Sequence, residues 1–390
     1  MYQLRPDHNA VLTTPLIATW KFDGGSQING GLALSGGTIF VATFGGDLYA
    51  LNAFSGEPRW HARGNGKILM STPIIVDGLV YVGSGKNGRL VKPEDADFAY
   101  TPNASGNPIW GEAGGDDLMA FDEQTGSSAW SLHTVGEDMP SPGFADGRLI
   151  FANGDLRLYG VDARTGATVW KRELDGLATM ASTTIASGHA YISYCNDAPY
   201  RCYTESLQPA NGETIWRAPF GNSDSSPTVA DRRVFVSGVQ DVLGPYEHEG
   251  RTIVAALNES DGRPLWQYKT PPGPYSQVGS SERAIAGTYS EGTYFQAWPE
   301  GDEILAFDAQ TGRVRWVFKT SAPVKMSPVI YRGRLYVGDV AGLLYVLDSS
   351  TGRLKSARSF NQPFTTSPPL ISGDTIFFAT YSTVYAIRLT

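Results

Sequence analysis

The stretch Asp47-Leu-Tyr-Ala-Leu-Asn-Ala-Phe-Ser-Gly-Glu-Pro-Arg-Trp60 decides the fold, because it recurs along the chain. It returns as Asp117-Leu-Met-Ala-Phe-Asp-Glu-Gln-Thr-Gly-Ser-Ser-Ala-Trp130. Further copies end at Trp170, Trp216, Trp266 and Trp316, and a seventh has Ser356 in place of the tryptophan. Each copy predicts a strand, a turn and a second strand, since the glycine at a fixed place suits a turn residue with positive φ.

A second phrase precedes each copy, as in Ser71-Thr-Pro-Ile-Ile-Val-Asp-Gly-Leu-Val-Tyr-Val-Gly83 and Met326-Ser-Pro-Val-Ile-Tyr-Arg-Gly-Arg-Leu-Tyr-Val-Gly338. It predicts a hairpin of two short strands around a polar turn. Each unit therefore has four strands and a period of about 40 to 50 residues, which is typical of a β-propeller blade.

The two ends of the chain complete the count of blades. The chain ends in a lone third strand, Thr383–Leu389, and begins with a lone fourth strand, Leu16–Phe22, which carries Trp20. Pairing them completes an eighth blade and leaves no long sheet edge exposed between the ends. We therefore expect an all-β fold, a single eight-bladed propeller domain over residues 1–390. Each blade has four antiparallel strands, and the N-terminal strand closes the ring by completing the last blade.

Composition supports this fold and excludes some partners. The 390 residues include 45 Gly and 24 Pro, yet 41% are hydrophobic, as expected of a packed protein rich in tight turns. A net charge of −8 with no basic run predicts no nucleic-acid binding. No apolar run is long enough to predict a transmembrane segment. The first residues do not have the order of a secretory signal segment.

The turn glycine, the tryptophan and the wording around them resemble the tryptophan-docking repeats of the pyrroloquinoline quinone (PQQ)-like propeller superfamily. The last two blades, Met326 to Ile387, resemble the propeller lipoprotein of the outer-membrane β-barrel assembly machinery. That resemblance implies a binding scaffold without a cofactor. The first two blades, from Asn29 onward, resemble quinoprotein alcohol dehydrogenases, which implies PQQ and calcium.

The sequence departs from the quinoprotein pattern. Gln27, Ile28 and Asn29 occupy the place near which that family has an adjacent cysteine pair. Gly-Ser-Gly-Lys-Asn-Gly, residues 83–88, stands where its calcium-ligand Glu is expected. Asn153 falls near the position of the family's Asn ligand.

Aligning the first strands of the blades on their turn glycine places equivalent residues in a ring at the channel mouth. Met70, Met139 and Met180 are members from consecutive blades, and Asp224 and Lys325 lie across the ring. Flexible thioethers make adaptable apolar contacts, so the ring predicts a ligand or partner site. The other interpretation is that the methionines only pack between blades.

A second ring two positions deeper is rich in hydroxyls, which we expect to satisfy backbone groups. Its members are Gly30, Thr72, Ser141, Ser182, Ser226, Ser281, Ser327 and Ser367. In blade 6, Glu282 and Arg283 replace the Ser-Pro wording, and Glu282 either pairs internally or holds a cation.

Insertions between the second and third strands distinguish blades 2, 4, 5 and 6. The insertion of blade 2, residues 86–115, contains Trp110, and that of blade 6 contains Trp298. Aromatic tips on one face suit a protein surface, a small molecule or a carbohydrate, and the other interpretation is loop variation without function. Cys195 and Cys202 flank the blade-4 loop. As a disulfide they indicate an extracytoplasmic protein, periplasmic or secreted, and two free thiols are the alternative.

From these features we expect a non-catalytic, extracytoplasmic propeller that acts as a binding or scaffold module through its loop-rich face. It needs no cofactor or metal, and no residue is assigned a catalytic role. The alternative is a PQQ-dependent quinoprotein dehydrogenase with a divalent cation at the channel mouth, held among the ring residues and Glu282.

Overall fold

The computed structural model describes residues 17–64, 71–85, 116–134, 136, 138–178, 180–197, 200–240, 251–269, 287–298 and 302–389. These residues form thirty-two β-strands and no helix. The strands make eight four-stranded antiparallel sheets, so the predicted eight-bladed β-propeller is confirmed. The described chain divides into two compact units, Ala33–Pro227 and Met1–Leu32 with Thr228–Thr390, and the single domain stays a prediction.

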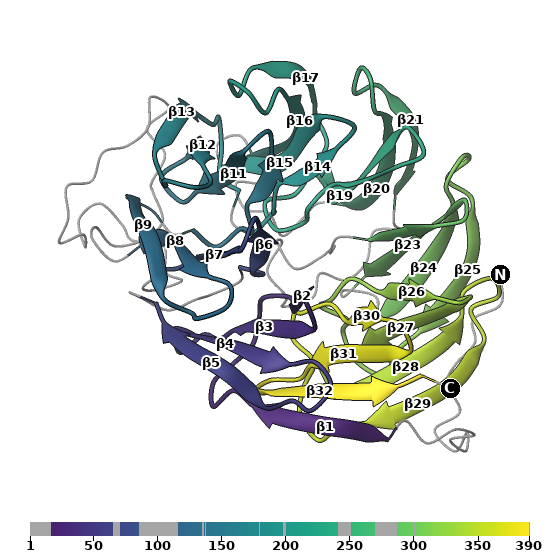
Figure 1. Ribbon diagram of the computed structural model, residues 1–390. Helices are drawn as coiled ribbons and strands as arrows, with labels where there is room; N and C mark the ends of the chain where they lie inside the picture. Colours follow the sequence, from purple (N-terminus) through teal and green to yellow (C-terminus); the bar gives the residue numbers. More distant parts are fainter. Residues whose placement is uncertain are drawn as a thin grey trace. The chain divides into compact units, whose positions relative to one another are not determined.

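Each blade of the unit Ala33–Pro227 is built from four successive strands (Figure 1). Blade 1 has β2 (Ala33–Ser35), β3 (Thr38–Ala42), β4 (Asp47–Asn52) and β5 (Pro58–Arg63), and blade 2 has β6 (Ile74–Val76), β7 (Leu79–Gly83), β8 (Asp116–Asp122) and β9 (Ser128–Thr134). Blade 3 has β10 (Gly143–Ala145), β11 (Arg148–Asn153), β12 (Arg157–Asp162) and β13 (Thr168–Glu173), and blade 4 has β14 (Thr184–Ala186), β15 (His189–Asp197), β16 (Tyr200–Leu207) and β17 (Thr214–Ala218).

The second unit holds the other four blades. Blade 5 has β18 (Thr228–Ala230), β19 (Arg233–Gln240), β20 (Arg251–Asn258) and β21 (Pro264–Lys269), and blade 6 has β22 (Thr288–Ser290), β23 (Thr293–Trp298), β24 (Glu303–Asp308) and β25 (Val314–Lys319). Blade 7 has β26 (Val329–Tyr331), β27 (Arg334–Gly338), β28 (Leu343–Asp348) and β29 (Leu354–Ser359), and blade 8 has β30 (Leu370–Ser372), β31 (Thr375–Ala379), β32 (Thr383–Arg388) and β1 (Ala18–Asp23). The N-terminal β1 lies antiparallel to β32, so the predicted closure of the last blade is confirmed (Figure 1).

Within each of the two units, the recurring tryptophan joins a blade to the one that follows it. The indole Nε1 of Trp266 donates to the carbonyl of Ala309 at 2.9 Å, and that of Trp316 donates to Ser349 at 3.0 Å. Both acceptors lie in the turn between the third and fourth strands of the following blade. Blade 8 has no such turn, because its third and fourth strands come from opposite ends of the chain. Ser356 of blade 7 therefore stands where a tryptophan would have no turn to bind.

The turn glycines are needed both for their φ and for the space that they leave. Gly312 has φ of 70°, and a Cβ added there would lie 2.6 Å from the Trp266 ring. Gly333 has φ of 71°, but nothing lies within 4 Å of its added Cβ. We expect both alanine substitutions to lose about 1–2 kcal/mol of stability from the left-handed backbone. Gly312→Ala should lose about 1–3 kcal/mol more, because the indole must move. Urea unfolding of the two variants measures the difference, and equal losses would contradict tryptophan docking as a packing constraint.

Aspartates before the turn glycines make the blades sensitive to acid. A hydrogen bond from Arg315, followed by bonds from Thr311, lowers the pKa of Asp308 to about 2. Hydrogen bonds from Ser350 and Thr351 lower the pKa of Asp348 as well. A depressed folded-state pKa adds stability above the unfolded value of about 3.9, and this stability is lost as the pH falls toward the folded value. As the pH is lowered from about 4 to about 2, we expect the urea concentration at the unfolding midpoint to decrease. Asp308→Asn is the control, because it lacks this carboxylate and its midpoint should decrease less over the same pH range.

Candidate functional site

The structure describes five of the nine predicted ligand-site residues. Met139 is buried, and Met180, Asp224, Lys325 and Trp298 are partly exposed. Met70, Trp110, Glu282 and Arg283 lie outside the described residues, as does most of the insertion 86–115.

Met180 and Asp224 come together at the entry to blades 4 and 5. The backbone N–H groups of Met180 and Ala181 both donate to the carbonyl of Ser223 at 2.9 Å. The Ser223 hydroxyl in turn donates to Oδ1 of Asp224 at 3.2 Å. A partly exposed thioether and a partly exposed carboxylate therefore belong to segments that are bonded to each other. The aligned first strands place Asp224 across the ring from the methionines, and the ring as a ligand site stays a prediction.

The deeper ring of hydroxyls links successive blades within the unit Ala33–Pro227. The N–H of Thr72 donates to the hydroxyl of Ser141 at 2.6 Å, and the N–H of Ser141 donates to Ser182 at 3.0 Å. The N–H of Ser182 donates to Ser226 at 2.9 Å. Each hydroxyl thus satisfies a backbone donor of the preceding blade, as expected from the sequence, and this ladder fixes the residues of the ring above it.

Blade 4 carries a longer hairpin than a typical blade of this chain. Its second strand, β15, has 9 residues, whereas β7 and β27 have 5. The sequence suggests a loop between the two cysteines, but the strand ladder continues through Cys195 and Cys202 to Asp197 and Tyr200. The two cysteines lie opposite each other and form the predicted disulfide.

The segment that leads into blade 4 is bonded to this hairpin. Leu177 donates its N–H to the carbonyl of Cys195 at 2.7 Å, and Cys195 donates to Leu177 at 3.0 Å. Met180 follows three residues later. The disulfide-linked hairpin and the segments that carry Met180 and Asp224 are therefore connected by backbone hydrogen bonds within this unit.

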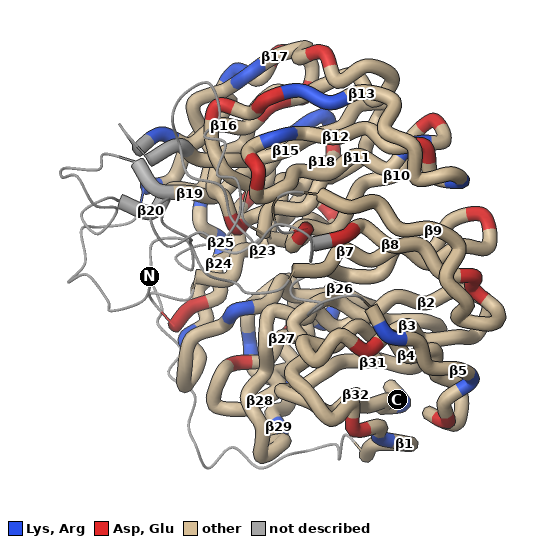
Figure 2. Tube along the Cα trace, turned by 90° about the vertical axis from the view of Figure 1, so that its left-hand side faces the viewer, with Lys and Arg blue, Asp and Glu red and all other residues tan. Residues whose placement is uncertain are grey.

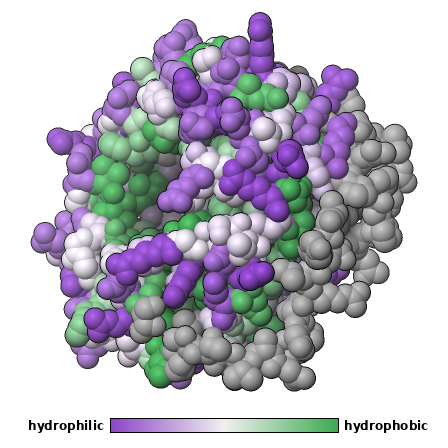
Figure 3. Space-filling model, turned by 90° about the vertical axis from the view of Figure 1, so that its right-hand side faces the viewer, coloured by the Kyte–Doolittle hydropathy of each residue, from purple (hydrophilic) through white to green (hydrophobic). Residues whose placement is uncertain are grey.

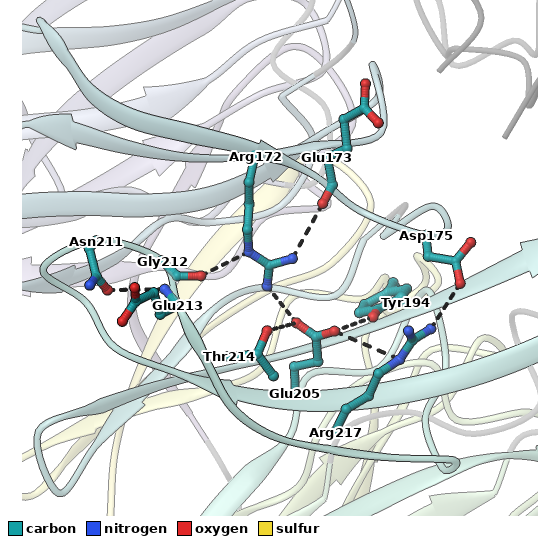
Figure 4. A network of polar contacts seen from close by, with 10 residues as sticks. All are labelled: Arg172, Glu173, Asp175, Tyr194, Glu205, Asn211, Gly212, Glu213, Thr214 and Arg217. Carbon is teal, nitrogen blue, oxygen red and sulfur yellow. Dashed lines mark hydrogen bonds and ion pairs between the residues drawn. The ribbon is translucent and has the colours of Figure 1, made fainter. Parts of the chain in front are cut away.

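A buried carboxylate, Glu205 on β16, organises the polar contacts of blade 4 (Figure 4). Arg172 on β13 of blade 3 approaches its Oε2 to 2.5 Å, and the Tyr194 hydroxyl donates to Oε1 at 2.5 Å. Arg217 on β17 lies 3.7 Å from Oε1 and binds Asp175 at 3.2 Å. These contacts connect blade 3 to all three outer strands of blade 4.

Arg217 also stacks on the aromatic pair next to the disulfide. Its guanidinium carbon lies 3.5 Å from the Tyr203 ring centroid and 5.4 Å from that of Tyr194. Burial, together with the negative charge of Glu205, raises the pKa of Tyr194, so its hydroxyl stays a donor at neutral pH. Figure 2 shows basic and acidic segments close together around β13 and β17. The cluster is therefore a charge-balanced brace for the hairpin.

Comparison of the blades could have revealed Glu205 from the sequence, because it interrupts an otherwise apolar register position. The equivalent residues of the other blades are Tyr49, Met119, Tyr159, Ala255, Leu305, Tyr345 and Tyr385. A carboxylate at a position that packs in every other blade must be paired when it is buried. The partners Arg172 and Arg217 could not be assigned in this way, since they come from different strands.

Two of the described residues near the expected quinone site, Asn153 and Ile28, do not fit a role in holding PQQ and calcium. Asn153 is buried, and its Oδ1 accepts from Gly136 at 3.1 Å and from Asp155 at 2.9 Å. Its Nδ2 donates to Asp138 at 2.8 Å, so the amide has no lone pair left for a cation. Ile28 is buried where the cysteine pair would lie, and its carbonyl accepts from Thr365 at 2.5 Å.

The described part of the chain has neither a cluster of metal-ligand side chains nor a membrane-spanning helix. No group of three or more His, Cys, Asp or Glu side chains there has the arrangement to hold a metal ion. Within those same residues, no helix has the length and apolar character to cross a membrane.

Comparisons with known proteins show which proteins this chain is similar to. A family model described as "Outer membrane protein assembly factor BamB" matches residues 18–192 and 250–390. Tetrathionate hydrolase of Acidithiobacillus ferrooxidans is 23% identical over 352 residues, which cover 87% of this chain and 68% of that protein.

Solved structures give the same fold. The crystal structure of BamB from Moraxella catarrhalis superposes with a TM-score of 0.69 at 15% identity, covering 96% of this chain and 100% of that one. Quinohemoprotein alcohol dehydrogenase from Comamonas testosteroni gives 0.66 at 13% identity, covering 95% and 76%. At these identities the likeness concerns the fold alone.

Proposed function

The chain belongs to the family of the outer membrane protein assembly factor BamB, and from this membership we propose that it is a non-catalytic scaffold that binds a protein partner. The partner class is a component of the machinery that assembles outer membrane proteins. The observation that carries the proposal is the family match over residues 18–192 and 250–390. These residues include six of the seven turn glycines and both strands that complete blade 8.

The geometry of blade 4 supports a binding role for its hairpin end. Met180 and Asp224 offer an apolar contact and a charge from bonded segments, and the hairpin beside them is fixed by the disulfide and by Glu205. A pre-organised surface loses little conformational freedom on binding. The disulfide further supports an extracytoplasmic location, where disulfides form and persist.

Photo-crosslinking in the native host tests this proposal. A photoreactive phenylalanine analogue at Met180 is expected to capture an outer-membrane assembly component, identified by mass spectrometry of the adduct. The same analogue at Lys21, an exposed residue of β1, is the control and should give no such adduct. Adducts of equal yield at Met180 and Lys21, or no adduct at Met180, would contradict binding through this end of blade 4.

An enzymatic function is the second candidate, and the similarity to tetrathionate hydrolase favours it. Incubation with tetrathionate, with thiosulfate, sulfate and elemental sulfur as the measured products, tests hydrolysis. Calorimetric titration with PQQ, with and without calcium, tests the quinoprotein alternative. The scaffold proposal expects no turnover and no heat, whereas metal-dependent stoichiometric PQQ binding would replace it.

A further inference from the structure

Three consecutive blades of the second unit carry an arginine directly after the turn glycine. These residues are Arg263, Arg313 and Arg353 in blades 5, 6 and 7. Blades 1 to 4 have Glu57, Ser127, Ala167 and Glu213 at the equivalent position. The repeat unit itself does not require a cation there, so the three arginines are a feature of this part of the chain.

The arginine side chains are exposed while their backbones are held. Arg263, Arg313 and Arg353 are all exposed, and the Arg263 side chain is 84% accessible. The carbonyl of Arg313 accepts from Asp308 at 2.8 Å, and that of Arg353 accepts from Asp348 at 2.8 Å. The turns of Arg313 and Arg353 also lie against the tryptophan of the preceding blade, since a Cβ added at Gly312 or Gly352 would lie 2.6–2.7 Å from Trp266 or Trp316. The guanidinium groups therefore project from turns whose backbone is fixed, one from each of three consecutive blades.

The nearest carboxylates are already used by other groups. Asp308 pairs with Arg315 at 2.7 Å, and Asp348 pairs with Lys355 at 3.3 Å. Among the described residues, Arg313 and Arg353 have no ion-pair partner of their own. Arg263 is partly compensated, because its Nε lies 3.6 Å from Asp261. Blades 6 and 7 thus each keep an excess positive charge at this turn, although the whole chain has a net charge of −8.

Blade 7 adds two more cations at the same end. The N–H of Ser349 donates to the carbonyl of Gly333 at 2.9 Å, which places the turn with Arg332 and Arg334 beside the turn before Arg353. Both arginines are exposed, and Arg332 shares its charge with Asp374 at 2.9 Å. Long hydrophilic side chains project on the side of the molecule shown in Figure 3, between smaller apolar patches. We call Arg263, Arg313, Arg332, Arg334 and Arg353 the arginine face.

We propose that the arginine face binds the phosphate headgroups of an anionic lipid bilayer. Guanidinium groups bind phosphate bidentately, and several cations presented on fixed turns match a broad anionic surface. A protein interface would need apolar or aromatic anchors at its centre. Of the described residues on the outer strands of blades 5 to 7, Leu265 is the large apolar side chain that is well exposed. The arginine face does not include Met180 or Asp224, so the proposal does not depend on the scaffold function.

Vesicle co-sedimentation of the full chain tests the proposal. The wild type is expected to bind vesicles of phosphatidylcholine with phosphatidylglycerol, but not vesicles of phosphatidylcholine alone, and to dissociate at high salt. At about 1 kcal/mol per cation near the surface, R263Q/R313Q/R353Q should bind about 100-fold more weakly. The control K21Q/R63Q/K171Q removes the same charge from exposed positions on β1, β5 and β13 and should bind as the wild type does.

Both triple variants should unfold at the same temperature as the wild type. Unchanged thermal midpoints would show that a loss of vesicle binding is not caused by a loss of folding. Absence of wild-type binding to the anionic vesicles at low salt would overturn the proposal, and so would equal losses in the two triple variants. Titration with polyglutamate tests whether the arginine face binds an acidic protein segment and not a lipid surface. Arginine-dependent binding to polyglutamate without binding to vesicles would replace the lipid with an acidic protein segment.

Discussion

Replacing Trp20 with alanine is expected to lower the free energy of unfolding by about 3–5 kcal/mol, the usual cost of removing a large buried aromatic side chain. Trp20 is 9% exposed, and its ring centroid lies 5.9 Å from that of Phe377 on β31. It is carried by β1, which pairs with β32 along the strand from Ala18 to Asp23. Loss of the indole therefore weakens the contact through which the N-terminal strand completes blade 8.

Urea unfolding followed by circular dichroism measures this effect without relying on tryptophan fluorescence. Lys21→Ala, on the same strand but exposed, is the matched control and should change the free energy by no more than about 0.5 kcal/mol. If the two variants were equally stable, β1 would contribute its backbone pairing but not its side-chain packing, and the importance given to Trp20 would be wrong.

The blade pattern could be predicted from the sequence because each repeat is a local unit. Gly312 and Trp316 are separated by a fixed number of residues, and the turn chemistry of that short segment determines its own geometry. Closure by β1 followed from counting, since a propeller does not leave a strand unpaired at each end. Even Ser356 has a structural reason, because the blade that follows it has no turn to receive an indole.

The candidate site could be predicted only in part, since its side chains meet across blades. The spacing of Cys195 and Cys202 indicated a disulfide, and the structure confirms it. The same spacing did not show that the strands continue past the cysteines, because ladder length depends on what packs against the hairpin. Glu205 departs from the apolar residues at the equivalent position of the other blades, so the sequence does mark it. Its partners Arg172 and Arg217 could not be predicted, because they come from other strands and charge pairing between strands leaves no periodic signal.

The brace around Glu205 is expected to depend strongly on Arg172. Arg172→Leu leaves the buried carboxylate with Arg217 at 3.7 Å and the Tyr194 hydroxyl as its main partners. Removing one partner of a buried pair is costly because the remaining charge is poorly solvated. Since these other partners remain, we expect a loss of about 2–4 kcal/mol in the free energy of unfolding, measured by urea titration.

The double variant Arg172→Leu/Glu205→Leu separates pairing from packing. It removes both charges, so it should be less destabilised than the sum of the two single variants by more than about 1 kcal/mol. The exposed pair Arg332–Asp374, at 2.9 Å with side chains 69% and 49% accessible, is the control cycle. Its coupling should lie within about 0–1 kcal/mol, because water screens both charges. Equal coupling in the two cycles would mean that Glu205 is solvated in the folded protein, and the hairpin would then be held by its disulfide and strand ladder alone.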